Sequence, residues 1–119
     1  MQAARAHEFV RDWVDAWNRH DVDAVLAHFA EDVTFTSPVA ARIVAGSDGV
    51  IRGKAALREY WNEGIRRIPD LHFELIGVYV GIDTLTINYR NQAGGLVNEV
   101  LRFDGDLAVE GHGTYLSES

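Results

Sequence analysis

The sequence predicts an α+β domain in which helices cover one face of an antiparallel sheet. Apolar residues in the first half of the chain recur at helical spacing, and those in the second half alternate with polar residues. Between two alternating segments lies Ala93-Gly94-Gly95, a turn sequence that predicts a β-hairpin. At 119 residues the chain has the length of one domain, and we expect a single domain over residues 1–119.

Three helices are expected in the first half. The first covers about residues 4–18, where an apolar stripe runs along one face. Asp21 is a typical N-cap for a second, shorter helix. A third helix follows Gly53 and ends before Pro69, because proline cannot continue a helix. The residues expected on the buried face of the second helix are Val22, Val25, Leu26 and Phe29.

Alternating segments predict the strands. We expect one strand over residues 33–37, ended by Pro38, and three more over residues 71–80, 84–90 and 107–116. A fifth strand follows the glycine turn. Within residues 71–80 the alternation shifts phase at Gly77, which predicts a bulge.

Folding about the glycine turn predicts a register that brings apolar side chains together on one face. This register places Tyr89 opposite Glu99, Ile87 opposite Leu101 and Leu85 opposite Phe103.

Residues 38–52 have apolar side chains but no sustained period, and they contain the turn sequence Gly46-Ser47-Asp48-Gly49. Two interpretations stay open for this segment, which are a lid over a pocket and an ordinary covering loop.

Composition excludes several classes of function. With 18 acidic and 11 basic residues the formal net charge is −7, so nucleic acid is not an expected partner. The chain has no cysteine, which excludes disulfides and thiolate chemistry. No apolar run approaches the roughly 18 residues of a membrane span, and we expect a cytoplasmic protein. The five histidines form no HxxxH or HExxH pair, so we expect neither a metal nor a cofactor.

Four segments together resemble the nuclear transport factor 2-like superfamily, and within it the SnoaL-like group. They are Trp13–Asp21, Phe29–Phe35, Arg52–Trp61 and Phe103–Gly105. The resemblance implies a curved antiparallel sheet that three helices of the N-terminal half wrap into a hollow cone. Its members include ketosteroid isomerase, scytalone dehydratase, limonene epoxide hydrolase and polyketide cyclases, but also binding and dimerisation domains without chemistry, so the fold does not settle the function.

Glu99 is the most informative candidate for chemistry, because it interrupts a run of apolar residues on the strand face expected to be interior. Loss of hydration raises the pKa of a carboxyl group and makes it a candidate acid or base. The resemblance aligns Glu99 with the protonated aspartic acid of ketosteroid isomerase. That enzyme's tyrosine and base aspartate align with Trp13 and Ser37, so we do not expect its mechanism here. The other interpretation is a structural carboxylate that is hydrogen-bonded to Tyr89 or to an indole.

Tyr89 and His112 are the other two catalytic candidates. Tyr89 shares the interior face of the hairpin and is expected to reach Glu99 or a ligand. His112 shares a face with Glu110; if that face is interior, His112 is a candidate general base. If the two neighbouring glycines change the phase of this strand, both side chains are solvated instead.

Aromatic side chains are expected either in a plain core or around a pocket at the centre of the cone. Ser37 is expected near the pocket mouth. The expected ligand-binding residues are Trp13, Trp17, Phe35, Ser37, Trp61 and Phe73.

Two functions therefore stay open. The first is a cofactor-independent acid/base enzyme of isomerase, dehydratase, cyclase or hydrolase type, acting on a small hydrophobic molecule. The second is a ligand-binding or dimerisation domain without chemistry. In both cases we expect a homodimer through the outer sheet face, because that face has more apolar residues than a solvated surface needs. The residues in question are Val78, Val80, Val100 and Val109.

Overall fold

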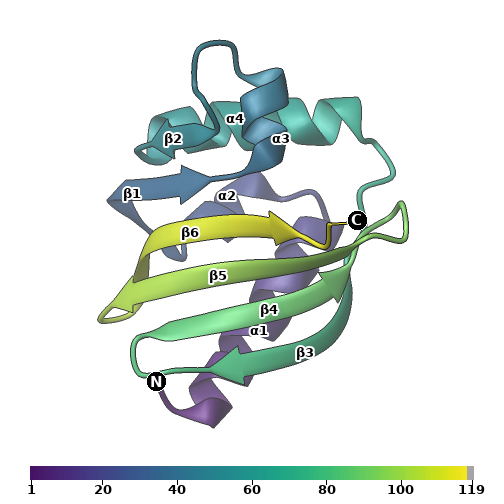
Figure 1. The fold of residues 1–119 in the computed structure, drawn as a ribbon. Helices are drawn as coiled ribbons and strands as arrows, with labels where there is room; N and C mark the ends of the chain where they lie inside the picture. The colour runs from purple at the N-terminus through teal and green to yellow at the C-terminus, as the bar shows by residue number, and fades with distance from the viewer. Residues whose placement is uncertain (118–119) are drawn as a thin grey trace.

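The computed structural model describes residues 1–117 and combines an N-terminal group of helices with a curved sheet (Figure 1). In chain order its elements are α1 (Ala3–Asn18), α2 (Val22–Leu26), β1 (Phe29–Thr36), α3 (Pro38–Ile43), β2 (Val50–Arg52), α4 (Lys54–Arg67), β3 (Glu74–Val80), β4 (Thr84–Arg90), β5 (Leu96–Asp104) and β6 (Leu107–Tyr115). The α+β class expected from the sequence is confirmed.

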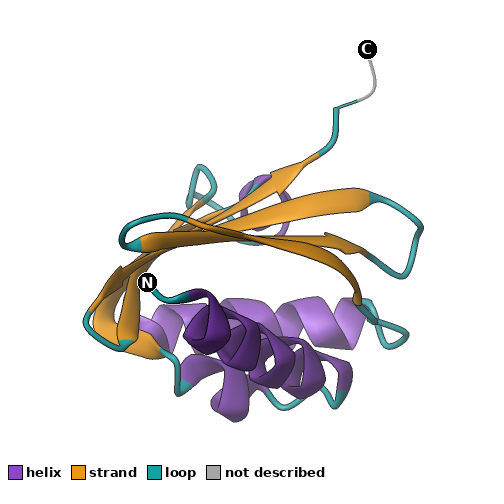
Figure 2. Cartoon of the chain, turned by 90° about the horizontal axis from the view of Figure 1, so that it is seen from below, coloured by secondary structure: helices purple, strands orange, loops and turns teal. Residues whose placement is uncertain are grey.

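The six strands form one sheet in the order β2-β1-β6-β5-β4-β3. The sheet is curved but not closed, and α1, α2 and α4 lie on its concave face (Figure 2). The expected sheet was antiparallel throughout, and this is wrong for one pair, because β1 and β6 run parallel. Turn residues fix the direction of neighbouring strands such as β4 and β5, but β1 and β6 are far apart in the chain and no turn relates them.

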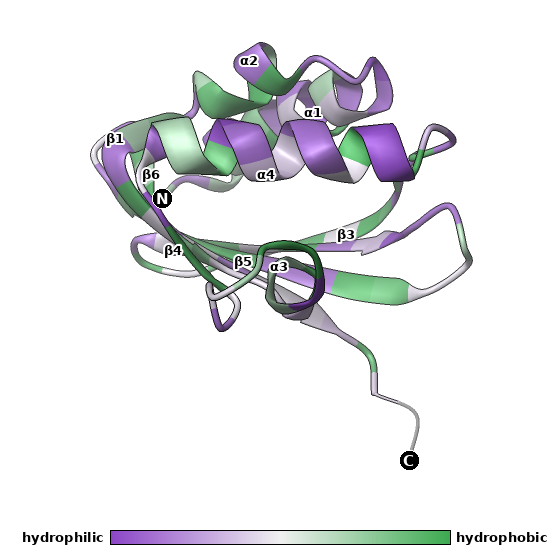
Figure 3. Ribbon diagram, turned by 90° about the horizontal axis from the view of Figure 1, so that it is seen from above, coloured by the Kyte–Doolittle hydropathy of each residue, from purple (hydrophilic) through white to green (hydrophobic). Residues whose placement is uncertain are grey.

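The helices follow the expected apolar spacing. α1 buries Val10, Trp13 and Trp17 against the sheet, and Asp21 caps α2 by accepting a hydrogen bond from the Ala24 amide at 3.0 Å. Figure 3 shows hydrophilic and hydrophobic stretches alternating along α4, as the sequence predicts for a helix packed on one side only. Phe29 is buried as expected, but it begins β1 rather than extending α2, because it pairs with β6.

Residues 38–52 are not a plain loop, because they form α3 and the short strand β2. Ser37 caps α3 by accepting a hydrogen bond from the Val39 amide at 3.1 Å, and Pro38 occupies the first turn, where its missing N–H costs nothing. Pro38 therefore ends one element and begins the next, and only the first of these roles was expected.

The β4–β5 hairpin differs from the expected register by two residues. Tyr89 pairs with Val97, Ile87 with Glu99, and Leu85 with Leu101. The connection covers residues 91–95 rather than three residues, because the Asn91 side chain accepts hydrogen bonds from two amides within the loop. A shift of two residues keeps every side chain on its face. The inward direction expected for Tyr89 and Glu99 is therefore unchanged.

Two glycines of the sheet behave as their sequence positions suggest. The bulge expected in β3 is present, since the β3–β4 register shifts between Leu75 and Gly77. At Gly111 in β6 an added Cβ would lie 2.8 Å from Cδ1 of Phe35 and 3.1 Å from Cδ2 of Leu101. The Phe35 ring is itself packed against Tyr60 and Trp61, so it has little room to move.

We predict that Gly111→Ala lowers the free energy of unfolding by about 1–3 kcal/mol, because the added methyl group overpacks the Phe35 site. Gly113→Ala in the same strand is the matched control, since its Cβ meets its nearest atoms only at 3.5 Å. Its effect should stay below about 1 kcal/mol. Urea denaturation of both variants checks this, and equal effects would contradict the proposed crowding at Gly111.

Candidate functional site

A cavity of about 290 Å³ lies between the concave face of the sheet and α4. That volume is at the lower end of ligand pockets and suits a small molecule. Aromatic and aliphatic side chains form most of its wall, and a few polar groups gather around Glu99. The residues expected at the site that do line this cavity are Trp17, Phe35, Ser37, Trp61, Phe73, Tyr89 and Glu99.

Glu99 lies on β5 and is only 7% exposed. Its Oε1 atom accepts a hydrogen bond from the Tyr89 hydroxyl at 3.0 Å. Burial raises the pKa of the Glu99 carboxyl from 4.5 to about 7, and the Tyr89 hydrogen bond opposes part of this rise. A carboxyl group with that pKa gives up and takes back a proton near neutral pH, as a general acid or base requires.

Tyr89 is held in place by stacking. Its ring lies on Phe73 with the centroids 4.1 Å apart, and Trp13 packs against both rings. Desolvation raises the pKa of the Tyr89 phenol well above its ordinary value, so the phenol stays protonated and donates to Glu99.

The C-terminal end of α1 fixes the segment that carries Phe73. The Asn18 side chain donates to the Phe73 carbonyl at 3.0 Å and accepts from the Phe73 amide at 2.8 Å. A ring nitrogen of His20 lies 2.8 Å from the Leu71 carbonyl oxygen. These bonds anchor the loop between α4 and β3, and with it one wall of the cavity.

Two further phenols, from Tyr60 on α4 and Tyr115 on β6, face the polar end of the cavity. Burial raises the pKa of Tyr60 to about 12 and also raises that of Tyr115. Both phenols are therefore hydrogen-bond donors at neutral pH. Gly113 keeps this end open, since a Cβ there would lie 3.5 Å from both Oε1 of Glu99 and Oγ of Ser37.

The apolar wall is built from rings in edge contact. Trp61 meets Trp17 with centroids 5.0 Å apart and Phe35 with centroids 5.5 Å apart, both nearly perpendicular. Such edge-to-face packing holds the rings firmly and presents their faces and edges to the cavity.

Two expected site residues do not line the cavity. Trp13 lies behind Phe73 and Tyr89, and its indole N–H has no partner among the described residues, as is also true of Trp17. His112 lies on the convex face of the sheet, where it pairs with Val100.

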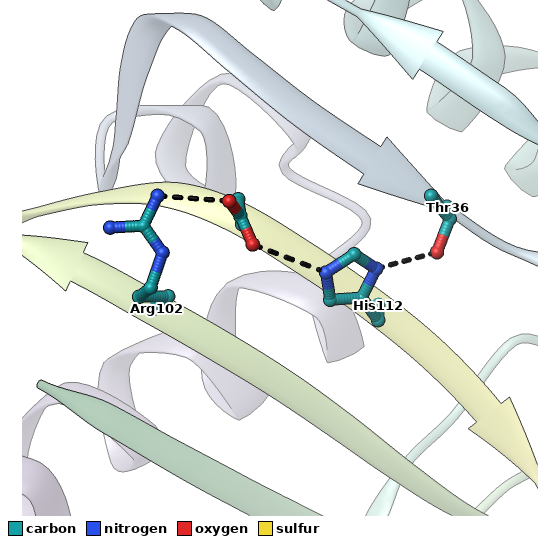
Figure 4. A network of polar contacts seen from close by, with 4 residues as sticks. Thr36, Arg102 and His112 are labelled. Atoms are coloured by element: carbon teal, nitrogen blue, oxygen red, sulfur yellow. Dashed lines mark hydrogen bonds and ion pairs between the residues drawn. The ribbon is translucent and has the colours of Figure 1, made fainter.

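The inward positions of β6 are occupied by Gly111 and Gly113, so the interior phase considered for His112 and Glu110 is wrong. On the convex face these two side chains form a polar network with Arg102 and Thr36 (Figure 4). A ring nitrogen of His112 lies 2.6 Å from the Thr36 hydroxyl, and Arg102 donates to Glu110 at 2.9 Å.

The cavity also contains polar residues that the sequence did not single out. They come from the ambiguous segment, from the apolar face of α4, from the β4–β5 loop and from the last strand. These residues are Arg42, Tyr60, Asn91, Gln92 and Tyr115. Helical spacing placed Tyr60 on a buried face, but spacing alone does not tell a pocket wall from a core.

Within residues 1–117 no three His, Cys, Asp or Glu side chains come together as a metal site would need. Over the same part of the chain, none of the helices has the length and apolar character to span a bilayer.

We predict that Glu99 makes stability fall as the pH rises. The folded-state pKa of about 7 exceeds the ordinary 4.5, so from about pH 4.5 to pH 7 the folded state holds a proton that the unfolded state has released. This difference in proton binding lowers the free energy of unfolding. The decrease is absent below pH 4.5, grows between pH 4.5 and pH 7, and stays constant above pH 7 at roughly 3 kcal/mol. Urea denaturation from pH 4.5 to pH 8 should therefore show Glu99→Gln gaining stability relative to the native sequence by about that amount.

The exposed Glu59 on α4 offers the matched control, because Glu59→Gln removes a carboxylate that is not buried. Its pH dependence should match that of the native sequence. If Glu99→Gln also left the pH dependence unchanged, Glu99 would not be a desolvated carboxyl group.

The family model described as "SnoaL-like domain" matches residues 10–113. A SnoaL-like protein of unknown function from Burkholderia thailandensis is 42% identical, with 98% of this chain and 99% of that chain covered and a TM-score of 0.91. No curated protein sequence matched the chain.

More distant structures share the fold. A candidate polyketide cyclase from Sinorhizobium meliloti is 14% identical, with 96% and 100% of the two chains covered and a TM-score of 0.75. The candidate hydroxylase AclR from Streptomyces galilaeus is 19% identical, with 97% and 91% covered and a TM-score of 0.75. Since the family model spans most of the chain and the Burkholderia protein matches nearly all of it, this chain belongs to the SnoaL-like domain family.

Proposed function

We propose that this SnoaL-like domain binds a small, largely apolar molecule in the cavity and that Glu99 exchanges a proton with it, without a cofactor. The observation that carries the proposal is a buried carboxyl group facing an aromatic cavity and supported by a single phenolic donor. A purely structural carboxylate would have its remaining acceptor positions filled by protein donors.

The chemistry follows from the groups at the polar end. As a carboxylate, Glu99 takes a proton from a carbon next to a carbonyl group. The C–H electron pair then forms a C=C bond, and the π pair of the carbonyl group moves to its oxygen. The phenols of Tyr60 and Tyr115 supply hydrogen bonds to that oxygen as negative charge develops. The protonated Glu99 then returns a proton, which is the shared step of isomerisations, dehydrations and cyclisations.

Proton exchange is testable before the substrate is known. In D₂O, 2-tetralone replaces its enolisable hydrogens by deuterium whenever a base removes them, and proton NMR follows the loss of signal. We predict exchange above the buffer background with the native protein, and a rate at least about 100-fold lower with Glu99→Gln. Glu59→Gln, with an exposed carboxylate removed, should exchange like the native protein.

The variant Tyr89→Phe separates the effect of the Tyr89 hydrogen bond on Glu99 from the proton transfer itself. Loss of the phenolic donor should raise the pKa of Glu99 further and move the pH midpoint of exchange upward, with the maximal rate less affected. Unchanged exchange in Glu99→Gln would remove the acid/base role from the proposal.

The alternative function is binding without chemistry. The same cavity supports it, since ring-lined walls hold an apolar ligand whether or not a proton moves. Tetralone that quenches the fluorescence of Trp17 and Trp61 without deuterium uptake would favour this alternative.

We also infer a homodimer through the convex face of the sheet, in a protein of the cytoplasm. The helices α1, α2 and α4 lie on the opposite, concave face (Figure 2), and the convex face carries Tyr79, which is 66% exposed. Val100 lies near its centre between Thr86 and His112. Val78 and Val80 were expected on this face, and this is wrong, because they pair with the buried Ile87 and Leu85 and share their inward phase.

Sedimentation at micromolar concentration tests the dimer. We predict a dimer for the native protein and a monomer for Val100→Glu, because the substitution would bury two uncompensated charges across the two-fold axis. A native protein that sediments as a monomer would contradict this assembly.

A further inference from the structure

Arg42 places a positive charge at the wall of the cavity, and the proposed acid/base role does not use this charge. It lies in the last turn of α3, is exposed to solvent and lines the cavity, where it is the one basic side chain among the described lining residues. Within residues 1–117, Arg42 forms no ion pair, although six other arginines do. A cation without a carboxylate partner at a pocket wall is available to a ligand.

The charge of Arg42 reaches the polar end of the cavity. Its guanidinium opposes the burial-induced rise in the pKa of both Tyr60 and Tyr115, and Glu99 acts on the same two phenols in the opposite sense. Arg42, both phenols and Glu99 therefore surround one region. With Glu99 protonated, that region contains hydrogen-bond donors and one positive charge, which is the composition of an anion site.

We propose that the cavity selects a small organic acid, with its ring system between the aromatic walls and its anionic group at Arg42, Tyr60 and Tyr115. This proposal rests on the proposed function, since it concerns the same cavity, and it adds the charge class of the ligand. The volume of about 290 Å³ limits the ring system to one or two rings.

Binding of an anion should be coupled to protonation of Glu99. The titratable groups that face its carboxyl are the phenols of Tyr89 on β4, Tyr60 on α4 and Tyr115 on β6, and the charge of Arg42 on α3 acts on the last two of these phenols. The three phenols stay protonated near neutral pH, so the carboxyl group is the member of the set that changes charge. A ligand anion beside it disfavours the carboxylate and draws a proton from solvent. With an organic acid bound, Glu99 therefore enters the proposed exchange as the proton donor and becomes the base only after giving its proton to the ligand.

The test is isothermal calorimetry with 2-naphthoate and its neutral, isosteric partner 2-naphthamide. Titrations at pH 8 in HEPES and in Tris, which differ in ionisation enthalpy, report the protons taken up on binding. The variants are Arg42→Gln, Arg42→Lys and Glu99→Gln, and Arg11→Gln is the control because Arg11 is exposed on α1 outside the cavity. Circular dichroism melting establishes that each variant is folded.

The proposal predicts that 2-naphthoate binds the native protein with uptake of roughly half a proton or more, and that 2-naphthamide binds with none. Arg42→Gln should weaken 2-naphthoate about tenfold and leave 2-naphthamide within about twofold, while Arg42→Lys restores part of the loss. Glu99→Gln should abolish the proton uptake, and Arg11→Gln should change nothing.

Two results would overturn the proposal, and only the second of them would also overturn the proposed function. If both probes bind and Arg42→Gln weakens them equally or not at all, the anion site is wrong and the apolar cavity of the proposed function stands. If neither probe binds the folded native protein, the cavity does not accept a ring of this size, and the proposed function fails together with the anion site.

Discussion

The burial of the Glu99 carboxyl group is the constraint on which the rest of the site depends. In water a carboxylate is fully hydrated, whereas at this position it has one phenolic donor and a wall of rings. The loss of hydration brings its pKa to about 7. The same burial lowers stability above neutral pH, so a reactive carboxyl group and a small stability cost have one physical origin.

The scaffold holds this carboxyl group through a chain of contacts that begins far from it in sequence. The Asn18 side chain, at the end of α1, hydrogen-bonds to both the backbone carbonyl and the backbone amide of Phe73, and the Phe73 ring stacks on the Tyr89 ring. Tyr89 in turn donates to Glu99. On the other side, Gly113 leaves the space that Glu99 and Ser37 share. The orientation of the acid is thus set by the strands β4 and β5 and by a loop that α1 anchors, as precise proton transfer requires.

Sequence reasoning located most of this arrangement because alternation along a strand is insensitive to small errors of register. The β4–β5 pairing was wrong by two residues, yet Tyr89 and Glu99 remained on the concave face. The same reasoning failed for His112, because its two neighbours at inward positions of β6, Gly111 and Gly113, have no side chain to reveal the phase. Arg42 was missed for a different reason, since a six-residue helix such as α3 is too short for its period to be recognised.

The most direct test of the account is the ionisation of Glu99 itself. With ¹³C-labelled glutamate, NMR follows the side-chain carboxyl signal of each residue through a pH titration, and Glu99→Gln identifies the signal by its absence. The account predicts that the Glu99 carboxyl group titrates near pH 7. A Glu99 signal that titrates near 4.5 would show a hydrated carboxylate and contradict a desolvated acid in the cavity.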